Sequence, residues 1–282
     1  MTTSESTTQR PQRSLDPATR SRASPNGGVM SAPRGISDTE WQLRCDLAAA
    51  YRLVALYGWT YLIGNHLSAR IPGTDDEFLL NPYGLMFEEI TASSLVKVDQ
   101  NGTILSETDH IINPAGFVIH SCIHAARHDI GCVMHLHTRD GSAVATQEGG
   151  LLPITQNALL IHDQVTYHDY EGVALNRDEQ KRLVADLGDK RIMMLRNHGT
   201  LTAGRTVGDA FVTMYRLEKA CELQIAAQSG GQRLYPLPQA VVQSTIETGR
   251  KIYSKGGLSP DGEREWKALL RKLDREDPDY RK

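Results

Sequence analysis

The sequence lacks several features that would assign it to particular classes of protein. No apolar run approaches the roughly 18 residues that cross a bilayer. The first residues carry none of the apolar core of a secretory signal. The formal net charge of −3 gives no basic field, so nucleic acid is not an expected partner. The sequence therefore predicts a cytoplasmic protein that binds neither nucleic acid nor membrane.

Cysteine is scarce, and no two cysteines form a C-x-x-C pair. The four are scattered along the chain, mostly among apolar or helical residues: Cys45, Cys122, Cys132 and Cys221. This pattern predicts buried free thiols in a reducing compartment rather than disulfides or a cysteine metal site.

The composition suits one medium-sized folded domain with a sparse N-terminal tail. With 282 residues and 40% hydrophobic side chains, the chain can bury an ample core. Residues 1–36 are rich in Ser, Thr, Arg, Pro and Gly, which predicts a disordered tail. Residues 37–282 are expected to form the domain, ending in helices at 238–254 and 263–274.

The order of apolar patterns predicts an α/β fold. Ser37 opens a capping-box pattern before a helix that Gly58 ends, and Asn-Gly at 101–102 marks a hairpin turn. We expect a central mixed β-sheet flanked by helices in three layers. Strands are expected near 66–71, 77–81, 94–99, 131–134 and 191–195, and further helices near 114–127, 141–147, 178–187 (capped by Asn176) and 207–227.

Two histidines lie at the end of a buried strand in the sequence GCVMHLHT, residues 131–138. Side chains at i and i+2 of a strand share one face, so His135 and His137 point the same way. Such a pair can bind one divalent metal ion. The alternative is a pair of histidines that only hydrogen-bond to their neighbours at a strand end.

A third histidine favours the interpretation that these histidines bind a metal ion. His198 follows the apolar strand RIMML and precedes a glycine. In open α/β sheets, sites form beyond the carboxyl ends of strands, and both histidine groups lie at such ends. Three imidazoles there would leave coordination positions open, as a catalytic metal needs.

The motifs together resemble the class II aldolase and adducin family, with the adducin head as an especially close match. They stand in that family's order: G-N-H-L-S-A-R at 64–70, N-P-Y-G at 81–84, A-A-R-H-D-I-G-C-V-M-H-L-H-T at 125–138, and L-R-N-H-G-T-L at 195–201. The resemblance implies a homotetramer with sites between subunits. It also implies that His135, His137 and His198 are the ligands of one divalent ion. Three histidines suit zinc or iron(II) before manganese or cobalt.

The sequence departs from the sugar-phosphate aldolases where their acid/base glutamate stands. Counted back from His135, that position is Gly116. Pro114 and Ala115 replace the serine pair that holds the substrate phosphate in those enzymes. Asn65 and Gly84 match other positions of the phosphate pocket and, with Gly116, are the expected substrate contacts. We expect Gly116 to leave an open side of the metal, with room for a larger organic acid.

His120 is the one candidate for the missing proton transfer, although a structural role is the stronger expectation for it. Residues 155–172, with His162, Asp163, Tyr167 and His168, are expected to form a polar loop near a neighbouring subunit.

Three functions remain open. The first is a metal-dependent lyase that cleaves or decarboxylates a small, non-phosphorylated hydroxy- or oxo-acid. The second is a non-haem iron(II) oxygenase that shortens an aromatic 2-oxo acid, as in aminocoumarin biosynthesis. The third is a non-catalytic, adducin-like binding module, which the retained histidines and the end of the chain at Lys282 disfavour.

Overall fold

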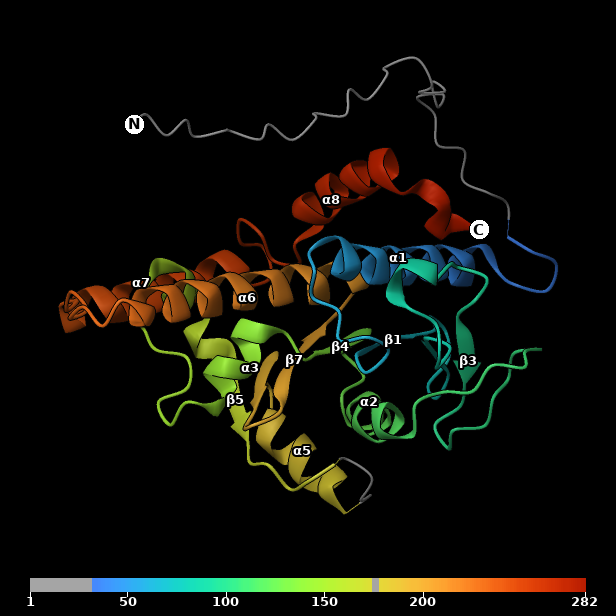
Figure 1. Cartoon of the computed structure of the whole chain (residues 1–282). Helices are drawn as coiled ribbons and strands as arrows, with labels where there is room; N and C mark the ends of the chain where they lie inside the picture. The colour runs from blue at the N-terminus through green and yellow to red at the C-terminus, as the bar shows by residue number, and fades with distance from the viewer. Residues whose placement is uncertain (1–31, 174–177) are drawn as a thin grey trace, which may run out of the picture.

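A seven-stranded sheet forms the centre of the protein (Figure 1). The computed structural model describes residues 32–173 and 178–282. The strand order is β3-β2-β1-β4-β7-β6-β5, and every neighbouring pair is antiparallel except the parallel pair β5 and β6. The strands are β1 (His66–Arg70), β2 (Phe78–Leu80), β3 (Val96–Val98), β4 (Cys132–Leu136), β5 (Val165–His168), β6 (Ile192–Leu195) and β7 (Gly199–Gly204).

Helices cover both faces of this sheet, which confirms the predicted α/β class (Figure 1). The first helix begins at its predicted cap, where the Ser37 side chain accepts a hydrogen bond from the backbone N–H of Glu40. The helices are α1 (Asp38–Leu56), α2 (Pro114–Ala126), α3 (Arg139–Thr146), α4 (Gln156–Ile161), α5 (Glu179–Leu187), α6 (Val207–Ser229), α7 (Gln239–Tyr253) and α8 (Glu263–Glu276). Short 3-10 turns lie at Phe87–Glu89, His162–Gln164 and Pro278–Arg281.

Alternation along β1 and β4 decides which side chains meet. Met134 and Leu136 join the core that packs under α1 and α6, whereas Val133 joins the core under α2 and α5. Because the period of a strand is two, His135 must point to the α2 face. On β1, Leu67 likewise faces the first core. The neighbouring polar residues of β1 therefore also face α2.

One central strand was not predicted from the sequence. Apart from Leu201, β7 consists of threonine, alanine and glycine, yet it pairs with β4 on one side and with β6 on the other. Since β4 and β6 are each antiparallel to β7, they run parallel to one another. Their carboxyl ends therefore lie at the same edge of the sheet, as the site prediction requires.

The prediction of a long polar loop at 155–172 is wrong. This segment forms α4, a 3-10 turn and β5, and β5 hydrogen-bonds in parallel with β6. The predicted tail also differs at its inner end, where Ala32 and Ile36 pack against Trp41 and Cys45. The rest of that tail and the predicted cap Asn176 lie outside the described residues.

Two further expectations concern the cysteines and the membrane. All four cysteines are free and buried, as predicted. Within residues 32–173 and 178–282, no helix combines the length and the apolar character needed to cross a bilayer.

Candidate metal centre

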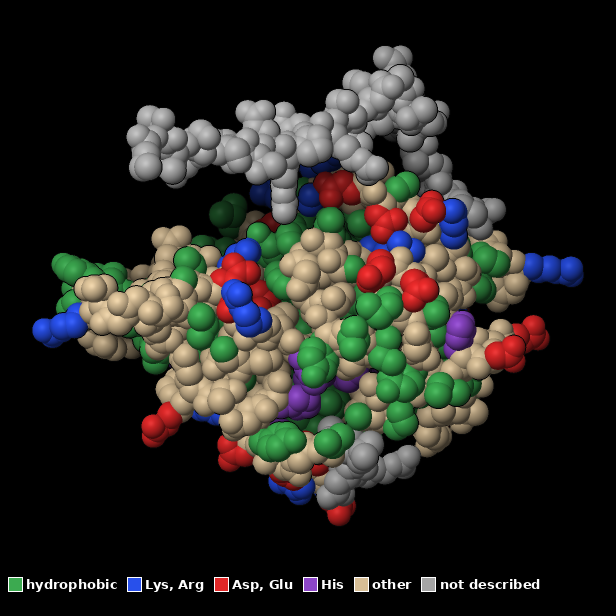
Figure 2. All heavy atoms as spheres, viewed as in Figure 1, with side chains coloured by type: hydrophobic (Ala, Val, Ile, Leu, Met, Phe, Trp, Pro, Cys, Tyr) green, Lys and Arg blue, Asp and Glu red, His purple; other side chains and the backbone are tan. Residues whose placement is uncertain are grey.

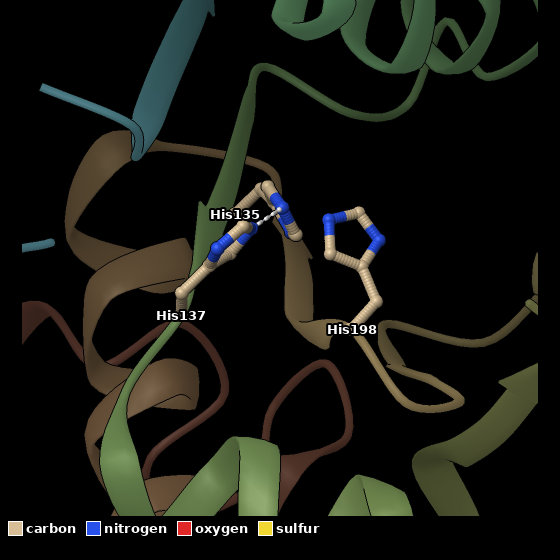
Figure 3. Close-up of side chains that lie close together, drawn as sticks. All are labelled: His135, His137 and His198. Carbon is tan, nitrogen blue, oxygen red and sulfur yellow. Dashed lines mark hydrogen bonds between the residues drawn. The ribbon is translucent and has the colours of Figure 1, made fainter. Parts of the chain in front are cut away.

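The three histidines converge at the shared strand edge (Figure 3). His135 is the buried fourth residue of β4, and His137 follows the end of the strand on the same face. His198 lies in the turn between β6 and β7, where Asn197 adopts a left-handed conformation with φ 56°. Asparagine tolerates that conformation better than most residues. Each pair of imidazole rings has a centroid separation of 4.7 Å, and the three ligand atoms lie within 4.8 Å of one another.

The hydrogen bonds of His135 leave its outer nitrogen for a ligand. Its Nδ1 donates to the carbonyl oxygen of Thr200 at 3.0 Å, which fixes the proton on Nδ1 and a lone pair on Nε2. That Nε2 lies 2.8 Å from Nε2 of His137. Two lone pairs repel at this distance, so the contact requires a proton or a cation between the nitrogens.

The environment keeps all three imidazoles in the neutral form that binds metals. Burial lowers the pKa of His198 to about 4. Burial likewise lowers the pKa of His137, and it holds the pKa of His135 well below its ordinary value, with His66 as the next cause. Because the charged form is disfavoured, little proton competition opposes a metal ion at neutral pH.

Hydrogen bonds from neighbouring groups fix the position of the segment that carries His137. The side-chain oxygen of Asn65 accepts the backbone N–H of His137 at 2.9 Å, while its amide nitrogen donates to the carbonyl of Trp59. Thr138, next in the chain, donates to the buried carboxyl of Glu218 at 2.7 Å. Burial raises the pKa of Glu218 to about 7.

Gly199 lets β7 approach the histidine pair. A Cβ atom at this position would lie 2.6 Å from the carbonyl oxygen of Leu136 and 3.1 Å from Cδ2 of His137. Real Cβ atoms do not approach an oxygen so closely, so the site depends on the absence of a side chain here.

A cavity of about 250 Å³ opens over the three rings. On the face shown in Figure 2, histidine side chains lie at the floor of a hollow that is bordered by hydrophobic side chains. The described residues that line it include no lysine or arginine; they are Gly64, His66, Asn113, Ala115, Ile119, His135, His137, Tyr170, Gly172, Val173 and His198. A larger hollow of about 870 Å³ lies beside α1 and α8, but within the described chain the histidine trio is the one cluster suited to a metal.

The other predicted site residues take different positions. Neither Asn65 nor Gly84 lines the cavity; the side-chain oxygen of Asn65 accepts from the backbone N–H of His137, and its amide nitrogen donates to Trp59. Gly84 lies in the turn after β2 with φ 115°. Their assignment as substrate contacts stays a prediction, as does the role of His120, which is buried behind the cavity.

The prediction that Gly116 leaves free space beside the metal site is wrong at this glycine, although the cavity over the three histidines stays open. A Cβ atom there would lie 2.7 Å from Cδ2 and 3.0 Å from Nε2 of His66. The ring of His66, on β1, already fills that space. The sequence pattern did not assign His66 to the site, whereas the structure places it among the buried cavity residues. Its position opposite His135 in the β1 and β4 pairing is the signal that could have identified it.

Comparison with known proteins agrees with this fold. Residues 45–225 match the model of the "Class II Aldolase and Adducin N-terminal domain" family. A Pseudomonas aeruginosa protein provisionally named as a class 2 aldolase is 51% identical over 247 residues, which cover 87% of this chain and 94% of that protein. Mouse alpha-adducin is 40% identical over 242 residues, 82% of this chain but 33% of the adducin.

Two solved structures extend the comparison. An aldolase II superfamily protein from Pseudomonas syringae superposes with a TM-score of 0.83 at 52% identity, covering 88% of this chain and 98% of the other. An L-fuculose 1-phosphate aldolase from Glaciozyma antarctica superposes with a TM-score of 0.75 at 27% identity, covering 89% and 97%. The family match spans more than half of the chain, and two close relatives are covered almost throughout. The chain therefore belongs to the class II aldolase and adducin family.

Proposed function

We propose that His135, His137 and His198 bind one divalent metal ion, zinc or iron(II) before manganese or cobalt. The observation that carries this proposal is the meeting of three neutral imidazoles within 4.8 Å at one edge of the sheet. Three histidines with a cavity above them suit a catalytic ion, because positions remain for a substrate. A bound ion would polarise a carbonyl group and stabilise negative charge that develops on its oxygen.

The reaction that we propose is lyase chemistry on a small, non-phosphorylated hydroxy- or oxo-acid. Such a molecule offers a hydroxyl or carbonyl oxygen next to a carboxylate, a pair that suits a metal ion with open positions. The cavity of about 250 Å³ is of a size for a small organic acid and is lined mainly by apolar and histidine side chains. The cleavage of a carbon–carbon bond, or decarboxylation, is the reaction class that we expect.

A sugar phosphate fits this cavity poorly. A dianionic phosphate is held by charge-assisted donors such as Arg, Lys or a cluster of hydroxyl groups. The described residues around the cavity provide no lysine or arginine, and Ala115 offers no side-chain donor where the aldolases carry serine. The likeness to an L-fuculose 1-phosphate aldolase therefore supports the fold and the metal more strongly than it supports the same substrate.

Two tyrosines favour a second candidate, the oxidative shortening of an aromatic 2-oxo acid by an iron(II) enzyme. The ring centroid of Tyr61 lies 5.4 Å from that of His137, and the ring centroid of Tyr170 lies 6.3 Å from that of His198. Both are more than half exposed, so each can contact an aromatic group at the rim of the cavity. We rank this candidate second because iron oxygenases commonly bind the metal through two histidines and a carboxylate.

Exposed apolar residues support a homotetramer, the assembly expected from the family. Four of them lie close together in sequence on the segment that leads from α6 into α7: Leu234, Tyr235, Leu237 and Val241. Tyr235 is 87% exposed. Contiguous apolar side chains on a surface commonly mark a contact with another chain.

Metal analysis of protein purified without oxygen tests the proposed function. We expect close to one divalent ion per chain, lost in His137→Ala and retained in the matched control His128→Gln, which alters an exposed histidine. The loaded protein is then incubated with a panel of 2-oxo and 2-hydroxy acids while oxygen uptake and carbon dioxide release are followed. Turnover without oxygen uptake supports the lyase, and turnover that requires oxygen supports the second candidate. Absence of bound metal would contradict both and favour a non-catalytic binding module.

A further inference from the structure

His66 occupies the place from which a side chain at position 116 would extend. It is 3% exposed and lines the cavity above the three histidines. Its ring centroid lies 4.9 Å from that of His135 and 4.8 Å from that of His120. Of the described residues around the cavity, His66 and Tyr170 are the side chains outside the metal trio that can exchange a proton or donate a hydrogen bond from an ionisable group.

A series of buried hydrogen bonds, called here the hydrogen-bond chain, fixes the ring of His66 on the side away from the cavity. Its Nδ1 lies 2.7 Å from Nε2 of His120 on α2. Nδ1 of His120 lies 2.5 Å from Oγ of Ser68, which lies 2.7 Å from Nε2 of His124. All four side chains are buried. The chain begins at the cavity, where Nε2 is the ring nitrogen that His66 does not share with His120.

We propose that His66 donates a hydrogen bond from Nε2–H to an oxygen atom of the organic acid held at the three histidines, and that His120, Ser68 and His124 fix the tautomer that allows it. This inference rests on the proposed function, because it assumes an acid in that cavity. In this proposal His66 supplies the substrate contact that no side chain at position 116 can make.

The chemistry of the ligand decides which atom donates in each hydrogen bond of this series. Carboxylate, carbonyl and enolate oxygens only accept hydrogen bonds, so Nε2 of His66 must carry the proton. His66 then accepts at Nδ1 from His120, which accepts at its own Nδ1 from Ser68, and Ser68 accepts from Nε2–H of His124. Each contact in the chain has one donor and one acceptor.

The inner end of this hydrogen-bond chain is compatible with the proposed direction. Nδ1 of His124 is buried and has no hydrogen-bond partner in the described structure. The carbonyl of Ile130 raises the pKa of His124 by less than burial lowers it, and it forms no hydrogen bond with this nitrogen. In the proposed direction Nδ1 carries a lone pair, and a buried acceptor without a partner is tolerated more often than a buried N–H without one.

His66 acts as a neutral donor in this arrangement. Burial lowers the pKa of His66 well below its ordinary value, and His120 is the next cause. Burial also lowers the pKa of His120 and brings that of His124 to about 3. A neutral imidazole beside a metal ion avoids the repulsion that an imidazolium would meet, and it can still polarise a carbonyl oxygen.

Oxalate is a suitable probe, because it is a two-oxygen chelator that resembles the enolate of a small 2-oxo acid. Its dissociation constant is measured by calorimetry on zinc-loaded full-length protein. His66→Leu is expected to weaken binding by about tenfold to a hundredfold, the range for a lost hydrogen bond to a charged group. His66→Gln, which keeps an N–H near the position of Nε2, is expected to retain most of the affinity. The exposed-site control His128→Gln should match the wild type.

Neutron diffraction of the deuterated wild-type protein locates the proton directly. We expect deuterium on Nε2 of His66 and on Nε2 of His120. Ser68→Ala interrupts the chain and is expected to reduce the occupancy at Nε2 of His66 and to weaken oxalate binding, with zinc content unchanged. A structural role of Ser68 alone would not move the proton.

The outcomes separate this inference from the proposed function. Wild-type protein that binds no zinc, or binds oxalate equally well without zinc, contradicts the proposed function. Metal-dependent oxalate binding that is equally tight in His66→Leu overturns the inference alone, as does a bare Nε2 on His66 in the neutron map. If His66→Leu loses zinc or fails to fold, the comparison of Ser68→Ala with the wild type and the neutron map still decides it.

Discussion

Gly199→Ala should damage the metal site through the backbone, without altering any ligand. The added Cβ would lie 2.6 Å from the carbonyl oxygen of Leu136 and 3.3 Å from Cε1 of His135. A carbon atom rests against a carbonyl oxygen at about 3.3 Å or more, so β7 must move away from β4 by roughly 0.7 Å. Metal–ligand distances tolerate only about 0.2 Å, and His198 enters β7 directly before this glycine.

Both metal affinity and stability are therefore expected to fall. Overpacking of this kind costs about 1–3 kcal/mol of the free energy of unfolding. In a domain of this size, that loss lowers the Tm by about 2–12 °C. The affinity for zinc is expected to fall by about tenfold to a hundredfold, the range for changes that displace ligands indirectly.

Zinc titration with a competing chelator, together with thermal unfolding with and without zinc, measures both effects. Gly230→Ala is the matched control. Its Cβ would meet nothing within 4 Å, and its backbone does not have a positive φ. The control should retain the affinity and the zinc-dependent rise in Tm. Wild-type zinc affinity in Gly199→Ala would refute the argument that the close approach of β7 builds the site.

Three further outcomes are expected. The unmodified protein should show negligible cleavage of fuculose 1-phosphate or rhamnulose 1-phosphate in a coupled aldolase assay, and robust cleavage would contradict the reading of the cavity. Burial lowers the pKa of His198 from 6.5 to about 4, so the unfolded chain binds more protons between these values. The free energy of unfolding of the metal-free protein should therefore fall as the pH drops from 6.5 to 4, and urea titrations should show a shallower fall in His198→Asn. Light scattering at micromolar concentration should give the mass of a tetramer, and a monomer would contradict the assembly proposed from the exposed apolar residues 234–241.

The parts of the site that follow from strand periodicity could be predicted from the sequence. Cys132–Leu136 is a short, uncharged apolar run, and the period of two places His135 and His137 on one face whatever the neighbouring strands are. The position of His198 follows from a similar run that ends just before it. Both placements depend only on residues that are near one another in the sequence, so they do not require knowledge of which strands pair.

The pairing of the strands could not be predicted in the same way. Gly199–Gly204 contains one leucine among threonine, alanine and glycine, and such a run does not stand out as a central strand. Its position depends on hydrogen bonds to β4 and β6, which join residues far apart in the sequence. The six residues of α4 are too few for a helical period to be recognised, so that segment was predicted as a loop.

The exchange of Gly116 for a side chain from β1 is also a tertiary effect, and it can be tested. Buried space beside a functional site is close-packed, so a glycine there means that another group fills the volume. Here that group is His66, whose Cδ2 lies 2.7 Å from the Cβ that Gly116 lacks.

Gly116→Glu must displace the ring of His66, and it is expected to cost about 1–3 kcal/mol of unfolding free energy and to create no efficient aldolase. Combining it with His66→Ala vacates the space and leaves a carboxylate that can accept from His120. In urea titrations the double variant should therefore be more stable than the sum of the two single changes predicts, by about 0.5–3 kcal/mol. Strict additivity, or a Gly116→Glu protein as stable as the wild type with His66 unmoved, would show that the two residues do not compete for one volume.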